Sequence, residues 1–227
     1  MSFVINGGVI KKKAKFSLDP ILGLNPIRYY RADNVVITDG LVSQLNDPNG
    51  NHATQSVLSN QPERLVDGNG DFFIRCSRDK GFVGNNLGVS NVLTFICSYK
   101  VTEINFGSVL SSDTGESSNR LNIHLPFQSD FNIYFDLGSS AANGGRLNSN
   151  WGGAINTKYT WTFQRNGANG FIQRDNTTIA SRTNMTSSYT GTGQTSWFLS
   201  SAGDLYKAVA FNYALTTEQI NLVKANL

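Results

Sequence analysis

Short apolar segments separated by turns rich in Gly and Asn recur along most of this chain, and they restrict its fold more than any other feature. Several of them alternate apolar and polar residues with a period of two, as strands do when one side faces a core. In LTFICSY, one side of the strand would carry Leu93, Phe95, Cys97 and Tyr99. The intervening DPNGN, DGNGD and RNGANG supply residues that tolerate the positive φ angles of tight turns. The pattern predicts an all-β protein of antiparallel strands.

The C-terminal segment, TTEQINLVKANL, departs from this pattern. Thr216 followed by Gln219 is a capping-box pattern, which satisfies backbone N–H groups at the start of a helix. Ile220, Val223 and Leu227 then recur at helical spacing. We therefore expect one short helix at the end of the chain, laid against a sheet.

Charge and hydropathy exclude several classes of partner. The net charge is only +3, whereas nucleic-acid binders carry a dense basic face. No run approaches the roughly 20 apolar residues of a membrane span. At the N-terminus the apolar residues precede the lysines, which is the reverse of a secretory signal. We expect no nucleic-acid partner, no membrane insertion, and assembly in a cytoplasm without export.

Residues 1–26 have the composition of an arm, because Pro20 and Pro26 oppose a continuous central strand. The one charge cluster of the chain lies in this arm and consists of Lys11, Lys12, Lys13 and Lys15. It is either a solvated extension or an assembly element that docks on an acidic partner surface. Residues 27–227 would form the folded domain.

Two cysteines, Cys76 and Cys97, occur in the apolar runs FFIRC and LTFICSY. Free Cys packs as a small apolar residue, so we expect two buried free thiols, with a disulfide as the alternative.

Segments 28–55, 61–76, 159–181 and 205–227 together resemble the laminin-G-like branch of the concanavalin A-like lectin/glucanase superfamily. Their most distinctive parts are NHATQ, which ends the first segment, and FNYALTTEQI in the last. The resemblance implies a two-sheet antiparallel jelly-roll β-sandwich over residues 27–227. It does not give a function, because this superfamily includes lectins, glycosidases, lyases, adhesion modules and structural virion parts.

No catalytic residue can be assigned from the sequence. Glycoside hydrolysis needs paired carboxylates, and the Glu-x-Asp-x-(x)-Glu spacing of the glucanase relatives is absent. The nearest acid pair, Asp113 and Glu116, has the spacing of a turn. Of the two histidines, His52 is expected to hold the NHATQ turn, and His124 is expected to be structural or exposed.

Two loops carry candidate binding residues. Asp47, Asn49 and Asn51 alternate oxygen ligands like the start of a calcium loop, and a plain Asx turn is the alternative. No other cofactor is indicated. The second loop, LNSNWGGAIN, could offer an exposed aromatic ring to a sugar, with amides beside it. Its candidate residues are Trp151, Asn148, Asn150 and Asn156. Here the alternative is that the tryptophan plugs one end of the fold or a subunit contact.

The leading hypothesis is a non-enzymatic structural or attachment protein of a bacteriophage virion, such as a tail, fibre or capsid-surface component. The branch that the chain resembles is frequent in such proteins, and virion proteins assemble in the host cytoplasm without a signal peptide. The arm would contact other virion proteins and further copies of the chain in a homo-oligomer, and the sandwich would be displayed toward host surface glycans. The alternatives are a carbohydrate-binding, lectin-like module and a divergent polysaccharide hydrolase or lyase.

Overall fold

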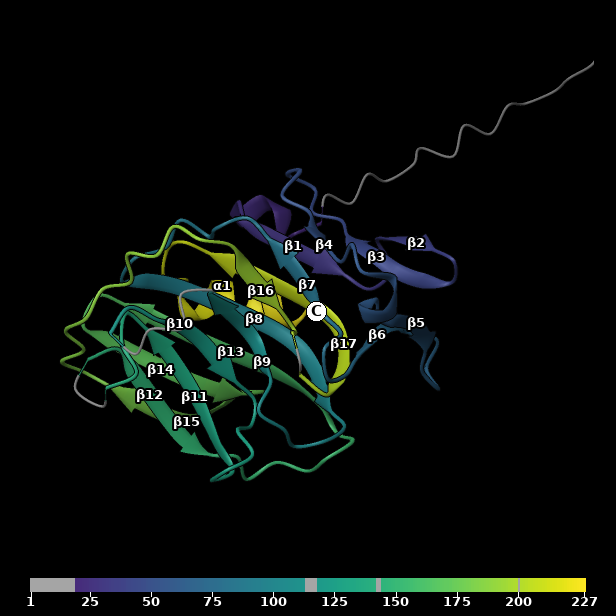
Figure 1. Ribbon diagram of the computed structural model, residues 1–227. Helices are drawn as coiled ribbons and strands as arrows, with labels where there is room; N and C mark the ends of the chain where they lie inside the picture. The colour runs from purple at the N-terminus through teal and green to yellow at the C-terminus, as the bar shows by residue number, and fades with distance from the viewer. Residues whose placement is uncertain (1–18, 113–117, 142–143, 200) are drawn as a thin grey trace, which may run out of the picture.

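The computed structural model describes residues 19–112, 118–141, 144–199 and 201–227. Within these residues it is built of antiparallel strands and a single α-helix near the C-terminus, so the predicted all-β class is confirmed (Figure 1). The four lysines of the predicted arm lie outside the described residues.

One run of strands contains the longest strands of the molecule. In order of pairing it consists of β1 (Arg28–Arg31), β17 (Gly203–Phe211), β8 (Val92–Val101), β13 (Lys158–Asn166), β14 (Asn169–Arg174) and β15 (Thr177–Arg182). Strand β6 (Phe72–Cys76) pairs with the beginning of β17, on the side that β1 occupies further along. We call these strands the first run.

A second run faces the first. It consists of β4 (Ala53–Thr54), β7 (Phe82–Gly84), β16 (Thr195–Trp197), β9 (Ser108–Ser112), β10 (Leu121–His124), β11 (Asn132–Leu137) and β12 (Arg146–Asn150). The runs are joined by β2 (Val35–Thr38), β3 (Leu41–Leu45) and β5 (Glu63–Val66), because β3 pairs with β4 and with β5, and β5 pairs with β6.

The hydrogen-bonded network is therefore continuous, and its two ends approach each other. Ser149 Oγ on β12 donates to the Ile179 carbonyl on β15 at 3.1 Å. Arg182 Nη1 on β15 donates to the Arg146 carbonyl on β12, also at 3.1 Å. We call this contact the β12–β15 seam, and it brings the sheet close to a closed barrel.

The main core fills the space between the two runs. Phe135 of the second run lies 5.8 Å from Phe163 of the first, and Trp197 lies 6.0 Å from Phe95. The predicted inward residues of β8, namely Leu93, Phe95, Cys97 and Tyr99, are all fully buried in this core. Cys76 and Cys97 are buried free thiols, as expected, and burial raises the pKa of both.

Helix α1 (Thr217–Lys224) covers the outer side of the first run. Its capping box between Thr216 and Gln219 is present, which confirms the predicted start of the helix. A second apolar cluster lies beneath it and comprises Ile21, Tyr29, Ile96, Val209, Phe211, Leu215, Ile220 and Val223. Within the described residues, no helix combines the length and the apolar character that a membrane span needs.

Two short 3₁₀ helices, η1 (Leu22–Leu24) and η2 (Leu58–Asn60), complete the fold. Residues 19–26, the described part of the predicted arm, lie against the body, since Ile21 is fully buried and Asp19 accepts a hydrogen bond from Tyr29. The boundary at residue 26 stays a prediction.

Candidate functional site

Strands β10, β11 and β12 present a polar outer surface. Alternate residues such as Ile123, Phe135 and Leu147 point into the core, so their neighbours point outward. We call the outward set the β10–β12 face, which comprises Arg120, Asn122, His124, Tyr134, Asp136, Arg146, Asn148 and Asn150. Helix α1 packs against the first run, so within the described chain it leaves this face without a helical cover (Figure 1).

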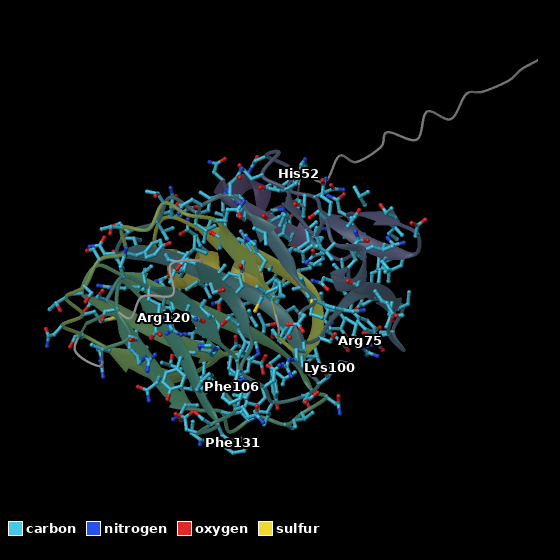
Figure 2. The ribbon with its side chains drawn as sticks, viewed as in Figure 1. His52, Arg75, Lys100, Phe106, Arg120 and Phe131 are labelled. Carbon is cyan, nitrogen blue, oxygen red and sulfur yellow. The ribbon has the colours of Figure 1, made fainter. Side chains whose placement is uncertain are left out.

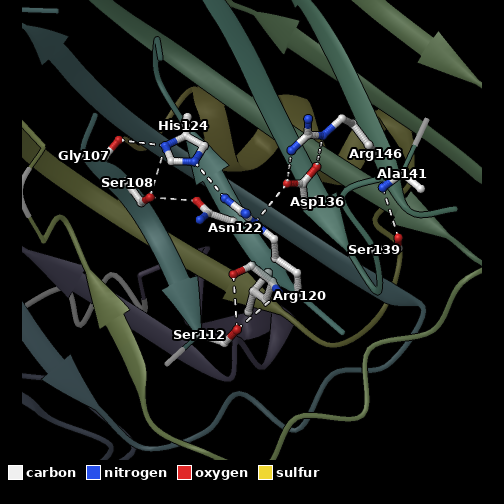
Figure 3. A network of polar contacts seen from close by, with 11 residues as sticks. Gly107, Ser108, Ser112, Arg120, Asn122, His124, Asp136, Ser139, Ala141 and Arg146 are labelled. Atoms are coloured by element: carbon white, nitrogen blue, oxygen red, sulfur yellow. Dashed lines mark hydrogen bonds and ion pairs between the residues drawn. The ribbon is translucent and has the colours of Figure 1, made fainter. Parts of the chain in front are cut away.

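A carboxylate shared by two arginines organises the face (Figure 3). Arg146 donates from Nε and Nη2 to the two oxygens of Asp136, at 2.7 and 2.8 Å. Arg120 Nε lies 3.2 Å from Asp136 Oδ2 in an ion pair. Asp136 is fully buried beneath these guanidinium groups, and its hydrogen bonds raise the pKa of Arg146. The two arginines are thus held in place, and together with Asp136 they leave one net positive charge.

His124 connects this cluster to the next loop. Its Nε2 lies 3.0 Å from Arg120 Nη2, and a guanidinium can only donate, so Nε2 accepts. The proton is then on Nδ1, which donates to the Gly107 carbonyl at 3.1 Å. His124 is only 6% exposed, and desolvation lowers its pKa, so the ring is neutral near pH 7. The predicted structural role fits this arrangement.

Aromatic rings continue the face beyond His124. Phe127 lies 4.7 Å from the His124 ring, 6.0 Å from Tyr134 and 5.1 Å from Phe106. Phe106 itself is 60% exposed, and Figure 2 shows it in the lower half of the view, below Arg120. The guanidinium of Arg146 lies over the Tyr134 ring at 4.3 Å, so that ring is fixed from one side.

A hollow of about 610 Å³ adjoins Phe106, and we call it the Phe106 hollow. Its lining residues are Arg78, Asp79, Glu103, Asn105, Phe106, Gly107 and Gln128. The pairing of β17 explains why distant segments meet here, because Gly203 lies opposite both Cys76 of β6 and Val101 of β8. The loops that follow these two strands therefore emerge at the same end of the fold. Since Gly107 accepts from His124, the hollow adjoins the β10–β12 face.

The residues of the predicted sugar-binding loop lie on different sides of the sheet. The expectation of an exposed Trp151 is wrong. Trp151 is only 6% exposed and stacks on Trp161 at 5.2 Å in the main core. The residues before it form strand β12, so Trp151 falls on the inward side with Leu147. Asn148 and Asn150 fall on the opposite side and belong to the β10–β12 face, directly across from Tyr134 and Asn132.

Asn156 lies apart from these residues, in the turn before β13. It adopts a φ of 64°, and its backbone N–H donates to the Val101 carbonyl at 2.8 Å. The structure therefore places two of the three predicted asparagines, Asn148 and Asn150, on one face. Neither of them lies beside an exposed tryptophan.

The predicted calcium residues form a turn. Asp47 Oδ1 accepts from the Asn49 backbone N–H at 3.1 Å, and the Asn49 side-chain amide donates to the Pro26 carbonyl at 3.0 Å. This is the Asx turn given as the alternative, and His52 Nδ1 accepts from the Asp47 N–H, as the predicted role in this turn requires.

The donor set does not fit a calcium ion. Asp47 is 2% exposed and desolvation raises its pKa, while the guanidinium of Arg28 acts on it as a nearby positive charge. Across the described ranges, no cluster of three or more His, Cys, Asp or Glu side chains could hold a metal.

Asp113 and Glu116 lie outside the described residues. Sequence spacing missed a different pair, Asp79 and Glu103, which line the same hollow.

Comparisons with solved structures identify the fold at low sequence identity. Domain 4 of an extracellular arabinanase from Geobacillus stearothermophilus, in complex with arabinotriose, aligns with a TM-score of 0.62 at 12% identity, over 87% of this chain and 97% of that one. The Trypanosoma rangeli sialidase in complex with sialic acid aligns with a TM-score of 0.56 at 13% identity, over 87% of this chain and 32% of that one. The binding domain of Botulinum neurotoxin serotype D gives 0.55 at 14%, over 88% and 50%.

No protein-family model matches the chain, and no curated protein matches its sequence. The structural matches show a β-rich, lectin-like fold, in line with the broader part of the predicted resemblance.

Proposed function

We propose that this protein is a non-enzymatic carbohydrate-binding domain, and that saccharide binds across the Phe106 hollow and the β10–β12 face. The observation that carries the proposal is the exposed Phe106 ring, supported from behind by Phe127 and bordered by a polar hollow. A sugar has apolar C–H faces and a rim of hydroxyl groups. An exposed aromatic ring packs against the first, while amide and charged side chains hydrogen-bond to the second.

The fixed geometry of the face favours binding. Arg146 and Arg120 are held by Asp136, and Arg120 is also held by His124, so a ligand does not have to order these long side chains. Groups that are ordered before binding cost less conformational entropy when the ligand arrives. Asn148 extends the polar surface beside Tyr134, where an exposed amide can both donate and accept.

The structural neighbours support the lectin-like alternative more than the virion hypothesis. They include an arabinanase domain in complex with arabinotriose and a sialidase carbohydrate-binding module bound to sialyllactose, the latter with a TM-score of 0.52 at 13% identity, over 67% of this chain and 95% of that one. Saccharide binding would suit host attachment, and the virion location, the virion partners and the homo-oligomer stay predictions. The two facing runs of strands agree with a laminin-G-like jelly-roll sandwich, which we propose as the finer fold assignment.

Binding without hydrolysis is part of the proposal. A glycosidase general acid needs a carboxyl group in surroundings that keep it protonated. The Asp79 side chain is 73% exposed and Glu103 is also exposed, so neither lies in the enclosed surroundings that such a general acid needs. The two acids of the hollow are better suited to accept hydrogen bonds from sugar hydroxyls.

The test is Phe106→Ala, screened on a glycan array and then measured by calorimetry with the oligosaccharide that binds best. We expect a rise in Kd of about tenfold or more, the equivalent of about 1.4 kcal/mol. Phe131→Ala is the matched control, because this ring is 53% exposed but does not line the hollow. Equal affinity of Phe106→Ala and the unmodified protein, or wild-type binding to no glycan, would refute the proposal. Release of product from the bound oligosaccharide would refute its non-enzymatic part.

A further inference from the structure

A second recessed surface lies beside helix α1, on the outer side of the first run, which faces away from the main core. The helix covers β1, β17 and β8, and leaves the outer side of β13 and β14 partly open. Two hollows of about 680 and 470 Å³ lie there, and Gln164 and Phe171 line both of them. We call the combined surface the Gln164 groove. Its other lining residues include Asn166, Asn169, Asn176, Asn221, Gln173, Lys224 and Arg182.

Gln164 is a buried residue of the groove whose side-chain hydrogen bonds are incomplete. It is only 8% exposed, and its Oε1 accepts from Thr94 Oγ1 at 2.8 Å and from the Leu215 N–H at 3.0 Å. Its Nε2 donates to no group in the described part of the chain. A buried amide whose oxygen is used within the protein, and whose nitrogen is left toward a groove, offers two N–H donors to a bound molecule.

The rim of the groove is made of amides that are similarly available. The side chains of Asn166, Asn169, Asn176 and Asn221 are exposed and make no hydrogen bond to any described residue. Each can donate and accept at once, which matches a hydroxyl group that also does both. The side chain of Phe171 lies between the two hollows, where a sugar ring could pack on it.

The two cationic side chains of the groove are held by neutral oxygen acceptors. Lys224 Nζ donates to Gln173 Oε1 at 2.7 Å and to the Asp175 carbonyl. Arg182 donates to the Arg146 carbonyl across the β12–β15 seam. No carboxylate is among the described residues that line either hollow. The groups left to hydrogen-bond a ligand are therefore mainly side-chain amides, which suit the hydroxyl groups of a saccharide.

From these features we infer that the Gln164 groove is a second saccharide site, which binds a segment of a linear oligosaccharide. Each hollow falls within the range of about 300–1,000 Å³ that is typical of small-ligand sites, and the shared wall makes them one elongated site. An extended peptide is the competing ligand class. The floor of the groove is the middle of a sheet, where β13 pairs with β8 and β14, so it offers no free strand edge for a peptide backbone.

Gln164→Glu is the variant that separates ligand binding from folding. The new side chain has the same shape and keeps an oxygen for Thr94 and Leu215, but it loses the two N–H donors that face the groove. The matched control is Gln194→Glu, which makes the same chemical change at an exposed residue that lines neither the groove nor the Phe106 hollow. Should Gln164→Glu melt well below the parent protein, Asn169→Ala and Asn221→Ala on the exposed rim take its place.

The probes are neutral hexasaccharides of arabinose, xylose, glucose and mannose, titrated by calorimetry and by NMR. We expect at least one of them to bind with a Kd that Gln164→Glu, or the rim variants, raises at least tenfold and that Gln194→Glu leaves within twofold. If none binds, or if binding is unchanged in Gln164→Glu and in both rim variants, the inference is wrong. Peptide binding that depends on Gln164 while every saccharide fails would also overturn it.

The two binding-site proposals can be refuted independently. Loss of glycan binding in Phe106→Ala alone would leave the proposed function standing without the second site. Loss of glycan binding in Gln164→Glu alone would support the groove as a binding site and refute the site at Phe106.

Discussion

The outer sides of the two strand runs are covered in different ways. Over the first run, helix α1 and η1 bury an apolar cluster, so that even the alternate polar residues Thr94 and Ser98 of β8 are buried. Over the second run, Arg120 and Arg146 extend across Asp136, so ion pairs rather than a helix cover the outer side of the sheet. The apolar cover stabilises the fold and excludes ligand from the strands beneath it, whereas a cover of fixed polar side chains leaves the face available for binding.

The largest expected effect is on the apolar cover. Phe211→Ala removes a fully buried ring beneath α1, and substitutions of this kind cost about 3–5 kcal/mol. We expect a matching fall in the free energy of unfolding in urea. Leu222→Ala is the control, because this α1 residue is 39% exposed and its loss should be small. Similar losses in both variants would mean that α1 does not bury the cluster as described.

The second effect is on the polar cover. Asp136→Ala leaves two guanidinium groups without their carboxylate, and the loss of one partner from a buried ion pair costs about 3–5 kcal/mol. Because the arginine side chains are 24% exposed and can turn to water, we expect about 2–3 kcal/mol here. Asp130→Ala is the control, since Asp130 is exposed beside the same strands. A loss below that of the control would show that the ion pairs do not stabilise the face.

The smallest effect concerns pH. Burial lowers the pKa of His124 below its usual value of about 6.5, so the unfolded chain binds a proton before the folded one does. Stability should therefore be retained above pH 6.5 and fall as the pH drops below it, until the folded state is protonated too. His124→Asn should flatten this part of the stability profile, while His52→Asn should not. A profile that is unchanged by His124→Asn would contradict the assignment.

The sequence predicted those parts of the fold that depend on local pattern. Period two placed Phe95 and Phe163 in the core, and the capping box located the start of α1 at Thr216. Both signals lie within a few residues of the structure that they specify, so no knowledge of the tertiary arrangement was needed.

The candidate site was predicted only in part. Asn148 and Asn150 lie exposed on the β10–β12 face, but the segment was treated as a loop, and so Trp151 was expected to be exposed beside them. Extending the strand alternation by a few residues would have placed Trp151 with Leu147 in the core. The Phe106 hollow carries no local signal, because Asp79, Glu103 and Gln128 meet only through the shared pairing of β6 and β8 with β17.

The β12–β15 seam has a consequence for behaviour at high concentration. Unpaired strand edges expose backbone groups that can recruit the edge of another molecule. Here the Ile179 carbonyl already accepts from Ser149, and the Arg146 carbonyl already accepts from Arg182. These acceptors are unavailable to an incoming strand, so this border resists the intermolecular β-pairing from which aggregates grow.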